Sequence, residues 1–206
     1  MTDDNPPAIF TETIESLAIV RFNRPVQRNP LSLSTLQELE RLTSSLFARD
    51  DIRSIIFTGS EDVFASGANI GELAQLDAAA ALRFSGYGQQ LFQTIADAKQ
   101  VTIAAINGYC FGGGLDLALA CDVRVASASA VFSHPGARLG IITGWGGTQR
   151  LPRIIGRARA LEFFATARRY SSNEALQMGL ISRVSDPVVD CAMDVAAAAK
   201  KLSNPS

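Results

Sequence analysis

The chain has 206 residues, of which 47% are hydrophobic and 19% are charged, and its formal net charge at pH 7 is -1. This length and apolar content fit one domain with a sizeable core, and the balanced charge argues against a nucleic-acid partner. The N-terminal residues are acidic and include no apolar signal segment, and no apolar run reaches the length of a membrane span. Cys110, Cys121 and Cys191 follow no metal-binding spacing, so we expect free thiols in the cytoplasm and no metal site.

Predicted strands and helices alternate along the first half of the chain. The expected strands cover residues 8–11, 17–22, 53–58 and 101–106, and the expected helices cover residues 32–48 and 77–98. The first two strands are expected to form a hairpin that turns near Glu15 and Ser16. Apolar residues recur on roughly one face of the first helix, and Asp77 is a candidate N-cap for the second.

The second half of the chain continues this alternation. The expected helices cover residues 113–120, 146–150, 158–165 and 187–201, and the expected strands cover residues 122–126, 131–132 and 180–184. Ser171 and Glu174 have the spacing of a capping box, which predicts a short helix that stops at Gly179. Strands that alternate with helices in this way predict an α/β fold with mixed sheets.

The most informative segment is the glycine-rich turn within residues 101–122. A β-branched run leads through Asn107-Gly108 to three glycines, Gly112 to Gly114, and then to a helix rich in Leu and Ala. The start of such a helix has unpaired N–H groups and the positive end of the helix dipole, so it suits a negatively charged oxygen. The spacing matches neither a Walker A loop nor a dinucleotide fingerprint. A tight α/β turn and an oxyanion hole of backbone N–H groups remain as interpretations.

Two further junctions strengthen the oxyanion-hole interpretation. The strand expected at residues 53–58 runs into Phe64-Ala65-Ser66-Gly67-Ala68-Asn69, and a third segment runs from Phe132 through His134 to Pro152. Together with residues 23–32, 107–122 and 139–151, and in this order, these segments resemble the crotonase superfamily of enoyl-CoA hydratases and isomerases. The resemblance covers most of residues 8–185 and is much more specific for the fold than for the reaction.

The resemblance implies an α/β fold in which repeated β-β-α units form a spiral. It implies that residues 1–185 are an acyl-CoA-binding core and that residues 186–206 begin a C-terminal helical region that is shortened in this chain. Relatives continue into further helices that cover the active site and join subunits, so we expect a homo-oligomer, a trimer or hexamer by family habit. An apolar surface left uncovered would also favour a partner subunit.

The resemblance also implies the chemistry of the site. Family members bind an acyl-CoA thioester, with no separate cofactor, and hold its carbonyl oxygen between two backbone N–H groups, here those of Ala68 and Gly113. A hydratase of the family uses two glutamates; Asp116 occupies the first position and Gly136 the second. Asp116 keeps a carboxylate with a shorter reach, whereas Gly136 has no side chain, so two-carboxylate hydration is in question. His134, the only histidine, is a candidate substitute for the lost glutamate.

The predicted substrate contacts extend beyond the acid and base groups. Trp145 and Phe84 are candidates for the acyl pocket, although core packing explains them equally well. The predicted substrate- and CoA-binding residues are Arg24, Gln27, Arg28, Gly67, Ala68, Asn69, Ile70, Gly112, Gly113 and Gly136. A basic side chain in the first of these segments would meet a phosphate of CoA, or it would belong to a solvated turn.

Three functions compete on the sequence alone. The leading one is an acyl-CoA-transforming enzyme of the hydratase/isomerase type, whose reaction could have changed to thioester hydrolysis or decarboxylation. The second is a non-catalytic acyl-CoA-binding or assembly protein, favoured by Gly136 and opposed by the intact glycine turn. The third is a peptidase of the Clp type, which Ser133-His134 suggests but which the turn opposes, because it offers Cys110 and no serine.

Overall fold

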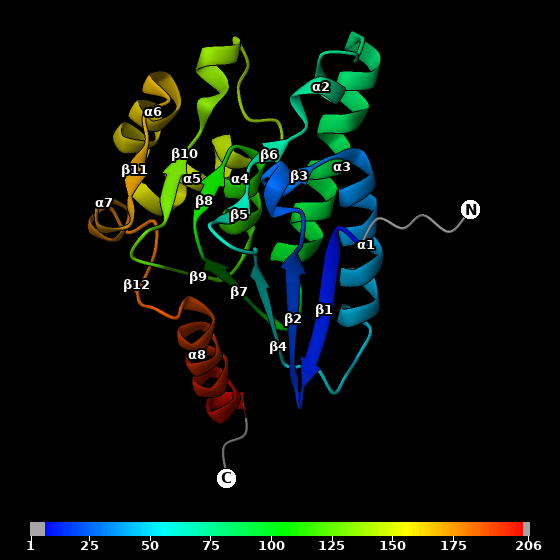
Figure 1. Ribbon diagram of the computed structural model, residues 1–206, viewed down its shortest axis with the longest axis vertical. Helices are drawn as coiled ribbons and strands as arrows, with labels where there is room; N and C mark the ends of the chain where they lie inside the picture. The colour runs from blue at the N-terminus through cyan, green and yellow to red at the C-terminus, as the bar shows by residue number, and fades with distance from the viewer. Residues whose placement is uncertain (1–6, 204–206) are drawn as a thin grey trace.

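The computed structural model describes residues 7–203, and its largest element is a six-stranded sheet (Figure 1). The strand order is β1 (Ile9–Ile14), β2 (Leu17–Phe22), β4 (Ser54–Thr58), β7 (Val101–Ile106), β9 (Val123–Ala126) and β12 (Arg183–Val184). The first two strands form the predicted antiparallel hairpin, and every later pair is parallel. The sheet is therefore built by long crossover connections, as parallel pairing requires.

Two smaller sheets stand beside the large one. The four-stranded sheet has the order β11 (Tyr170–Ser171), β10 (Val131–Ser133), β8 (Tyr109–Phe111) and β5 (Val63–Ala65). The two-stranded sheet pairs β3 (Pro30–Leu31) with β6 (Gly67–Ala68). Strands β10, β8 and β5 run parallel to one another, so their carboxyl ends meet at one edge.

Helices complete a spiral of β-β-α units. The helices are α1 (Leu33–Phe47), α2 (Ile70–Leu73), α3 (Ala78–Ala96), α4 (Gly113–Ala120), α5 (Gly147–Ile155), α6 (Arg157–Thr166), α7 (Ser172–Gln177) and α8 (Val188–Ser203), with the 3-10 turns η1 (Pro25–Gln27) and η2 (Pro135–Leu139). The units β4-β5-α3, β7-β8-α4 and β9-β10-α5 each give one strand to the large sheet and the next to the four-stranded sheet. This arrangement confirms the predicted spiral.

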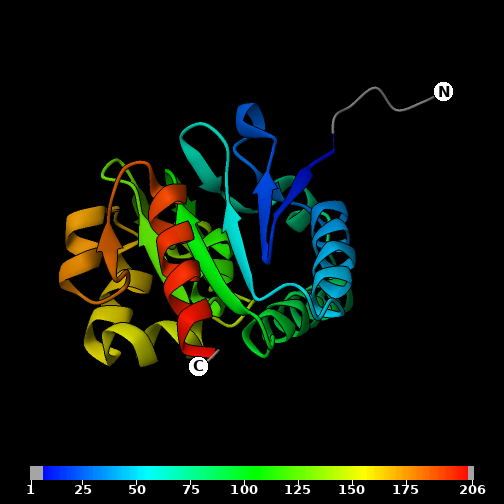
Figure 2. The same ribbon diagram turned by 90° about the horizontal axis from the view of Figure 1, so that it is seen from below.

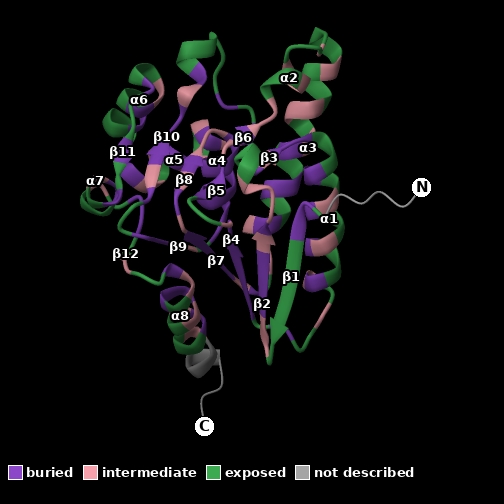
Figure 3. Ribbon diagram, viewed as in Figure 1, coloured by how far each residue is buried: buried purple, intermediate pink, exposed green. Residues whose placement is uncertain are grey.

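The large sheet has a hydrophobic layer on each face. Side chains such as Ile55 and Phe57 pack with α1, α3 and α4 in the main core, whereas their neighbour Ile56 packs against α8 in a second cluster. The alternation follows from the two-residue period of a strand. Figure 2 shows α8 on one side of the strands and α1 and α3 on the other, and Figure 3 shows the buried residues concentrated in the central strands and α4.

Most predicted elements are confirmed, and three have clearly different bounds. The first strand runs to Ile14 instead of residue 11, because it pairs with β2 along its whole length. The last strand covers only Arg183–Val184 instead of residues 180–184, because Leu180 and Ile181 are buried in the main core as part of a turn. The helix predicted at residues 146–150 continues to Ile155 through Pro152, since Leu151 and Ile155 on its inner side are buried. The predicted capping box is present, with Ser171 as N-cap and Glu174 completing it.

Three remaining sequence predictions concern the N-terminal segment, the possibility of a membrane span and the division of the chain into regions. The acidic segment of residues 1–6, for which we expect no secretory signal, lies outside the described residues, as do residues 204–206. Within residues 7–203, no helix combines the length and the apolar character that crossing a bilayer would require. The division of the chain at residue 185 stays a prediction.

Candidate active site

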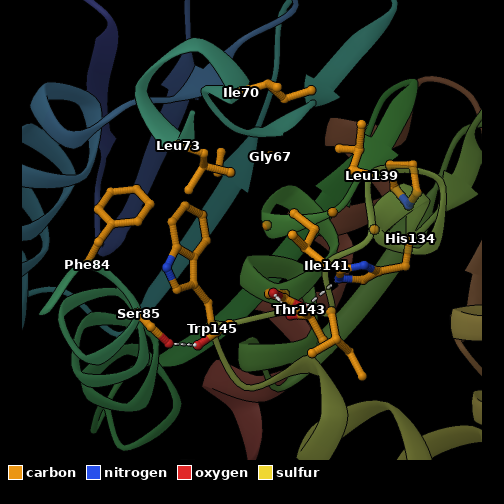
Figure 4. A pocket seen from close by; sticks show the side chains of 18 of the residues that line it. Gly67, Ile70, Leu73, Phe84, Ser85, His134, Leu139, Ile141, Thr143 and Trp145 are labelled. Atoms are coloured by element: carbon orange, nitrogen blue, oxygen red, sulfur yellow. Dashed lines mark hydrogen bonds and ion pairs between the residues drawn. The ribbon is translucent and has the colours of Figure 1, made fainter. Parts of the chain in front are cut away.

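A cavity of about 230 Å³ opens at the edge where the carboxyl ends of β5, β8 and β10 meet. The segments that follow these strands supply part of its lining, namely Ser66 to Ala68, Gly112 with Gly113, and His134 to Gly136. Helices α2 and α3 and the loop before α5 complete the wall (Figure 4). Residues that are far apart in the sequence therefore meet because parallel strands end at a common edge.

The glycine-rich turn and the turn after β5 lie directly against each other. Gly67 and Gly112 have φ values of 93° and 52°, a region that disfavours other residues. A Cβ on Gly67 would lie 2.7 Å from the Gly113 nitrogen and 2.9 Å from the Phe111 oxygen, so a side chain does not fit between the turns. Gly113 is the first residue of α4, where the N–H groups lack acceptors within the helix.

Asp116 lines the cavity from the first turn of α4 and is 1% exposed. Its Oδ1 lies 3.3 Å from Nε2 of His134, and its Oδ2 accepts a hydrogen bond from the Thr143 hydroxyl. His134 is 5% exposed, and its ring makes an edge-to-face contact with Phe164 at 5.3 Å between centroids. Figure 4 shows the His134 and Thr143 side chains directed toward the same part of the cavity. The structure therefore brings together two of the predicted catalytic side chains and adds Thr143.

Gly136 leaves the cavity without a second carboxylate. Among the described residues that line the cavity, Asp116 carries the only carboxylate. The Ile141 N–H donates to the Gly136 oxygen at 3.0 Å, and a Cβ on Gly136 would lie 2.6 Å from the Ile141 oxygen. The backbone thus closes over the position where a second acidic side chain would begin.

The rest of the wall is mostly apolar, and Trp145 forms a large part of it. Its indole is 4% exposed and makes edge-to-face contacts with Phe84 and Phe92, at 5.3 and 5.6 Å between ring centroids. A Cβ on Gly88 or on Gly113 would overlap the indole, so both glycines are needed for its position. Trp145 and Phe84 therefore fit both interpretations made from the sequence, because they pack in the core and also line the cavity.

Four of the predicted substrate-binding residues lie away from the cavity lining. Asn69 is the N-cap of α2 and accepts hydrogen bonds from the N–H groups of its first turn. Arg28 lies over the ring of Tyr109, at 5.7 Å from its centroid, and Gln27 is exposed. The Arg24 N–H donates to Asn29 Oδ1. The CoA contacts of these residues stay predictions.

The electrostatic surroundings of Asp116 include two other titratable groups. Burial raises the pKa of the Cys110 thiol well above its usual range, and the Asp116 charge raises it further. Burial lowers the pKa of Arg150, and the Asp116 charge opposes this effect. An uncharged buried thiol is a poor nucleophile, so Cys110 is not suited to the peptidase alternative. Ser133, also buried, donates to the Ala167 oxygen at 3.4 Å.

Several lining residues were not predicted from the sequence. Ser85 and Leu73 belong to segments that carry no motif, whereas Thr143 lies within residues 139–151 but was not singled out there. Only the closing of the loop before α5 brings Thr143 to Asp116, so nothing in the local sequence indicates this contact. Within residues 7–203, no group of three or more His, Cys, Asp or Glu side chains is arranged to hold a metal ion.

Comparisons with known proteins agree with this architecture. The family model described as enoyl-CoA hydratase/isomerase matches residues 12–206. The chain is 41% identical over 180 residues to YngF of Bacillus subtilis strain 168 and 38% identical over 180 residues to the crotonyl-CoA hydratase of Syntrophomonas wolfei; each match covers 87% of this chain and 69% of the relative. The structure of Pseudomonas aeruginosa DspI superposes with a TM-score of 0.90 at 32% identity, covering 98% of this chain and 83% of that one.

A spiral of β-β-α units with a cavity at the strand ends is the architecture of the crotonase superfamily. Within it, the chain belongs to the enoyl-CoA hydratase/isomerase family. It is an acyl-CoA-transforming enzyme of the hydratase or isomerase type. This membership confirms the predicted superfamily, fold class and general function, and it favours the enzyme over the non-catalytic and peptidase alternatives.

Proposed function

We propose that the protein catalyses the reversible addition of water to the double bond of a 2-enoyl-CoA. The names of relatives, crotonyl-CoA hydratase and short-chain-enoyl-CoA hydratase, support this substrate class. The observation that carries the proposal is the Asp116–His134 pair, which lies in the same cavity as the start of α4 and Ala68. Coenzyme A enters as part of the substrate, and no separate cofactor is needed.

The proposed reaction uses backbone and side-chain groups for different tasks. The N–H groups of Ala68 and Gly113 hold the thioester oxygen, which becomes negatively charged when the water oxygen bonds to the β-carbon. Each such donor typically lowers the barrier by about 2.7–4 kcal/mol. Asp116 accepts the proton that the water loses, and His134 donates a proton to the α-carbon. The proton then passes from Asp116 to His134 across their 3.3 Å contact, so both groups are restored and one water has been added.

The test measures turnover and binding separately. Hydration of crotonyl-CoA removes the conjugated enoyl thioester absorbance, and we expect Asp116→Asn and His134→Gln to lower kcat by at least about 100-fold. Asp122→Asn is the matched control, because Asp122 accepts hydrogen bonds from Thr102 at 2.8 and 2.9 Å and does not line the cavity. Retained turnover in Asp116→Asn would reject the proposed role of this carboxylate.

Binding of an acyl-CoA can be followed separately from turnover, by tryptophan fluorescence. Trp145 is the only tryptophan in the chain and lines the cavity, so its fluorescence reports on an acyl-CoA there. One observation keeps the binding protein as a second candidate: both oxygens of Asp116 already have partners and Gly136 has no side chain. A fluorescence change with crotonyl-CoA in the absence of turnover would select that candidate, and no change at all would reject both.

The proposal extends to the assembly and location of the enzyme. We expect a homo-oligomer, supported by exposed large apolar side chains at Ile70, Leu139, Ile141 and Ile142 around the cavity. Light scattering coupled to size-exclusion chromatography would give the subunit number directly. The three free cysteines support a cytoplasmic location, where thiols stay reduced.

A further inference from the structure

The Asp116 carboxylate is held between two side chains that come from different segments. His134 follows β10 and meets Oδ1, whereas Thr143 lies in the loop before α5 and donates to Oδ2. With one partner on each oxygen, the carboxylate cannot rotate about its terminal bond without losing a contact. The remaining lone pairs of a buried carboxylate are then the ones available to a molecule in the cavity.

Thr143 is itself fixed from two sides. The oxygen of the next residue, Gly144, accepts hydrogen bonds from Ser85 Oγ and Gln89 Nε2 of α3, both at 2.8 Å. On the other side, a Cβ on Gly147 would overlap Asp116 Oδ1 and lie 2.9–3.0 Å from the Thr143 side chain, so the absence of a side chain there leaves room for this contact. These contacts therefore fix the position of the Thr143 hydroxyl beside Asp116.

We propose that Thr143 is a positioning residue for the reaction: its hydroxyl aims the Asp116 carboxylate into the cavity and stabilises its negative charge. The inference rests on the proposed function for the reaction and on the two hydrogen bonds for the geometry. An aspartate side chain is short and reaches fewer positions in the cavity than a longer acidic side chain. Its carboxylate must therefore be oriented toward the substrate by neighbouring groups. A donor to a buried carboxylate favours the ionised form, which is the form that accepts a proton.

The other groups that face Asp116 do not replace this donor. His134 meets the opposite oxygen, Cys110 of β8 is a neutral buried thiol, and Arg150 of α5 acts through its charge without a hydrogen bond to the carboxylate. Removing the Thr143 hydroxyl therefore leaves Oδ2 without a donor from the described side chains. The carboxylate is then no longer fixed in one orientation, because only the contact of Oδ1 with His134 remains.

The kinetic test compares Thr143→Val, which keeps the shape and removes the hydroxyl, with Thr143→Ser, which keeps the hydroxyl. For Thr143→Val we expect kcat to fall roughly 10-fold to 100-fold, with KM for crotonyl-CoA changed much less, because a hydrogen bond to a charged group is lost. Thr143→Ser restores kcat, because it keeps the hydrogen-bond donor.

Thr58→Val is the matched control, since Thr58 is also buried and donates its hydroxyl to a backbone oxygen, that of Ala105, at 2.9 Å. We expect it to lower stability while kcat and KM stay close to the wild-type values. If Thr143→Val behaves like this control, Thr143 has only a structural role and the inference is overturned.

A second readout needs no substrate. His134 is the only histidine, so untagged protein gives one set of imidazole NMR signals, and these signals sense the position of the Asp116 carboxylate at 3.3 Å. We expect their chemical shifts at one fixed pH to change in Thr143→Val and to return in Thr143→Ser. Unchanged shifts overturn the inference. If the wild-type enzyme hydrates no enoyl-CoA but the shifts change, the proposed reaction fails while the positioning of Asp116 by Thr143 stands.

Discussion

Replacing Gly113 by alanine is the most direct perturbation of the proposed oxyanion hole. The added methyl group would overlap Cζ3 and Cε3 of the Trp145 indole. The indole cannot withdraw, because Phe84 and Phe92 contact it and Gly88 already leaves it no spare room. The first turn of α4 must therefore shift, and the Gly113 N–H shifts with it.

The shift of the Gly113 N–H is expected to change both kcat and the free energy of unfolding. Moving the N–H out of line removes one donor, which costs about 2.7–4 kcal/mol of barrier, or roughly 100-fold to 1000-fold in kcat. Overpacking against the indole lowers the free energy of unfolding by about 1–3 kcal/mol. Affinity for the acyl-CoA changes less than kcat, since the donor acts mainly on the charge that develops during the reaction.

Crotonyl-CoA hydration and urea unfolding followed by circular dichroism measure the two effects. Gly86→Ala is the control, because Gly86 lies within α3 with no atom within 4 Å of the added Cβ. We expect this control to keep its kcat and to gain about 0.5–1 kcal/mol of stability, as alanine does in place of glycine within a helix. If Gly113→Ala retained the wild-type kcat and the Trp145 emission spectrum, neither the steric overlap nor the role of this N–H would hold.

Three further predictions concern the surroundings of the site. Gly136→Glu should not raise the hydration rate and should lower the melting temperature, because its Cβ begins 2.6 Å from the Ile141 oxygen; a faster, equally stable variant would contradict this. Asn29→Ala should lower the free energy of unfolding by about 1–3 kcal/mol in urea denaturation, since the buried amide bonds two β5 carbonyls at 2.9 and 3.2 Å. Glu174→Ala should cost about 0.5–1 kcal/mol at pH 7 through loss of the capping box. Hydrogen bonds from the Ser171 backbone and from Arg168 lower the pKa of Glu174 to about 2. The stability it contributes is therefore full above about pH 4.3 and is lost as the pH falls toward 2, so the Tm difference should vanish there.

The strands of the large sheet and the longer helices were predicted well from the sequence because those elements have strong patterns. In β4 and β7 nearly every residue is buried, so both strands read as continuous apolar runs between turn residues. Strand β8 was missed because it has only three residues, Tyr109 to Phe111, and ends at the glycines. The repeated units were predicted from the family resemblance and not from a recurring pattern in the residues themselves.

The site was predicted in part, for a similar reason. Asp116, Gly113 and Ala68 belong to motifs at strand ends, and the structure places all three at one cavity. Thr143 and the apolar wall come from segments whose positions depend on how loops close in three dimensions. The sequence could indicate that Gly136 lacks a carboxylate, but only the structure reveals that the Ile141 carbonyl occupies the adjacent space.

Three successive β-β-α units each send one segment to the same cavity, after β5, β8 and β10. The first two carry the backbone groups proposed to hold the thioester oxygen, and the third carries His134 and Gly136. A substitution in one unit can therefore alter the acid and base groups of the cavity while the backbone groups of the other two units stay in place. Position 136, which has no side chain, belongs to the third unit, so a change of chemistry there is separated along the chain from the proposed oxyanion hole.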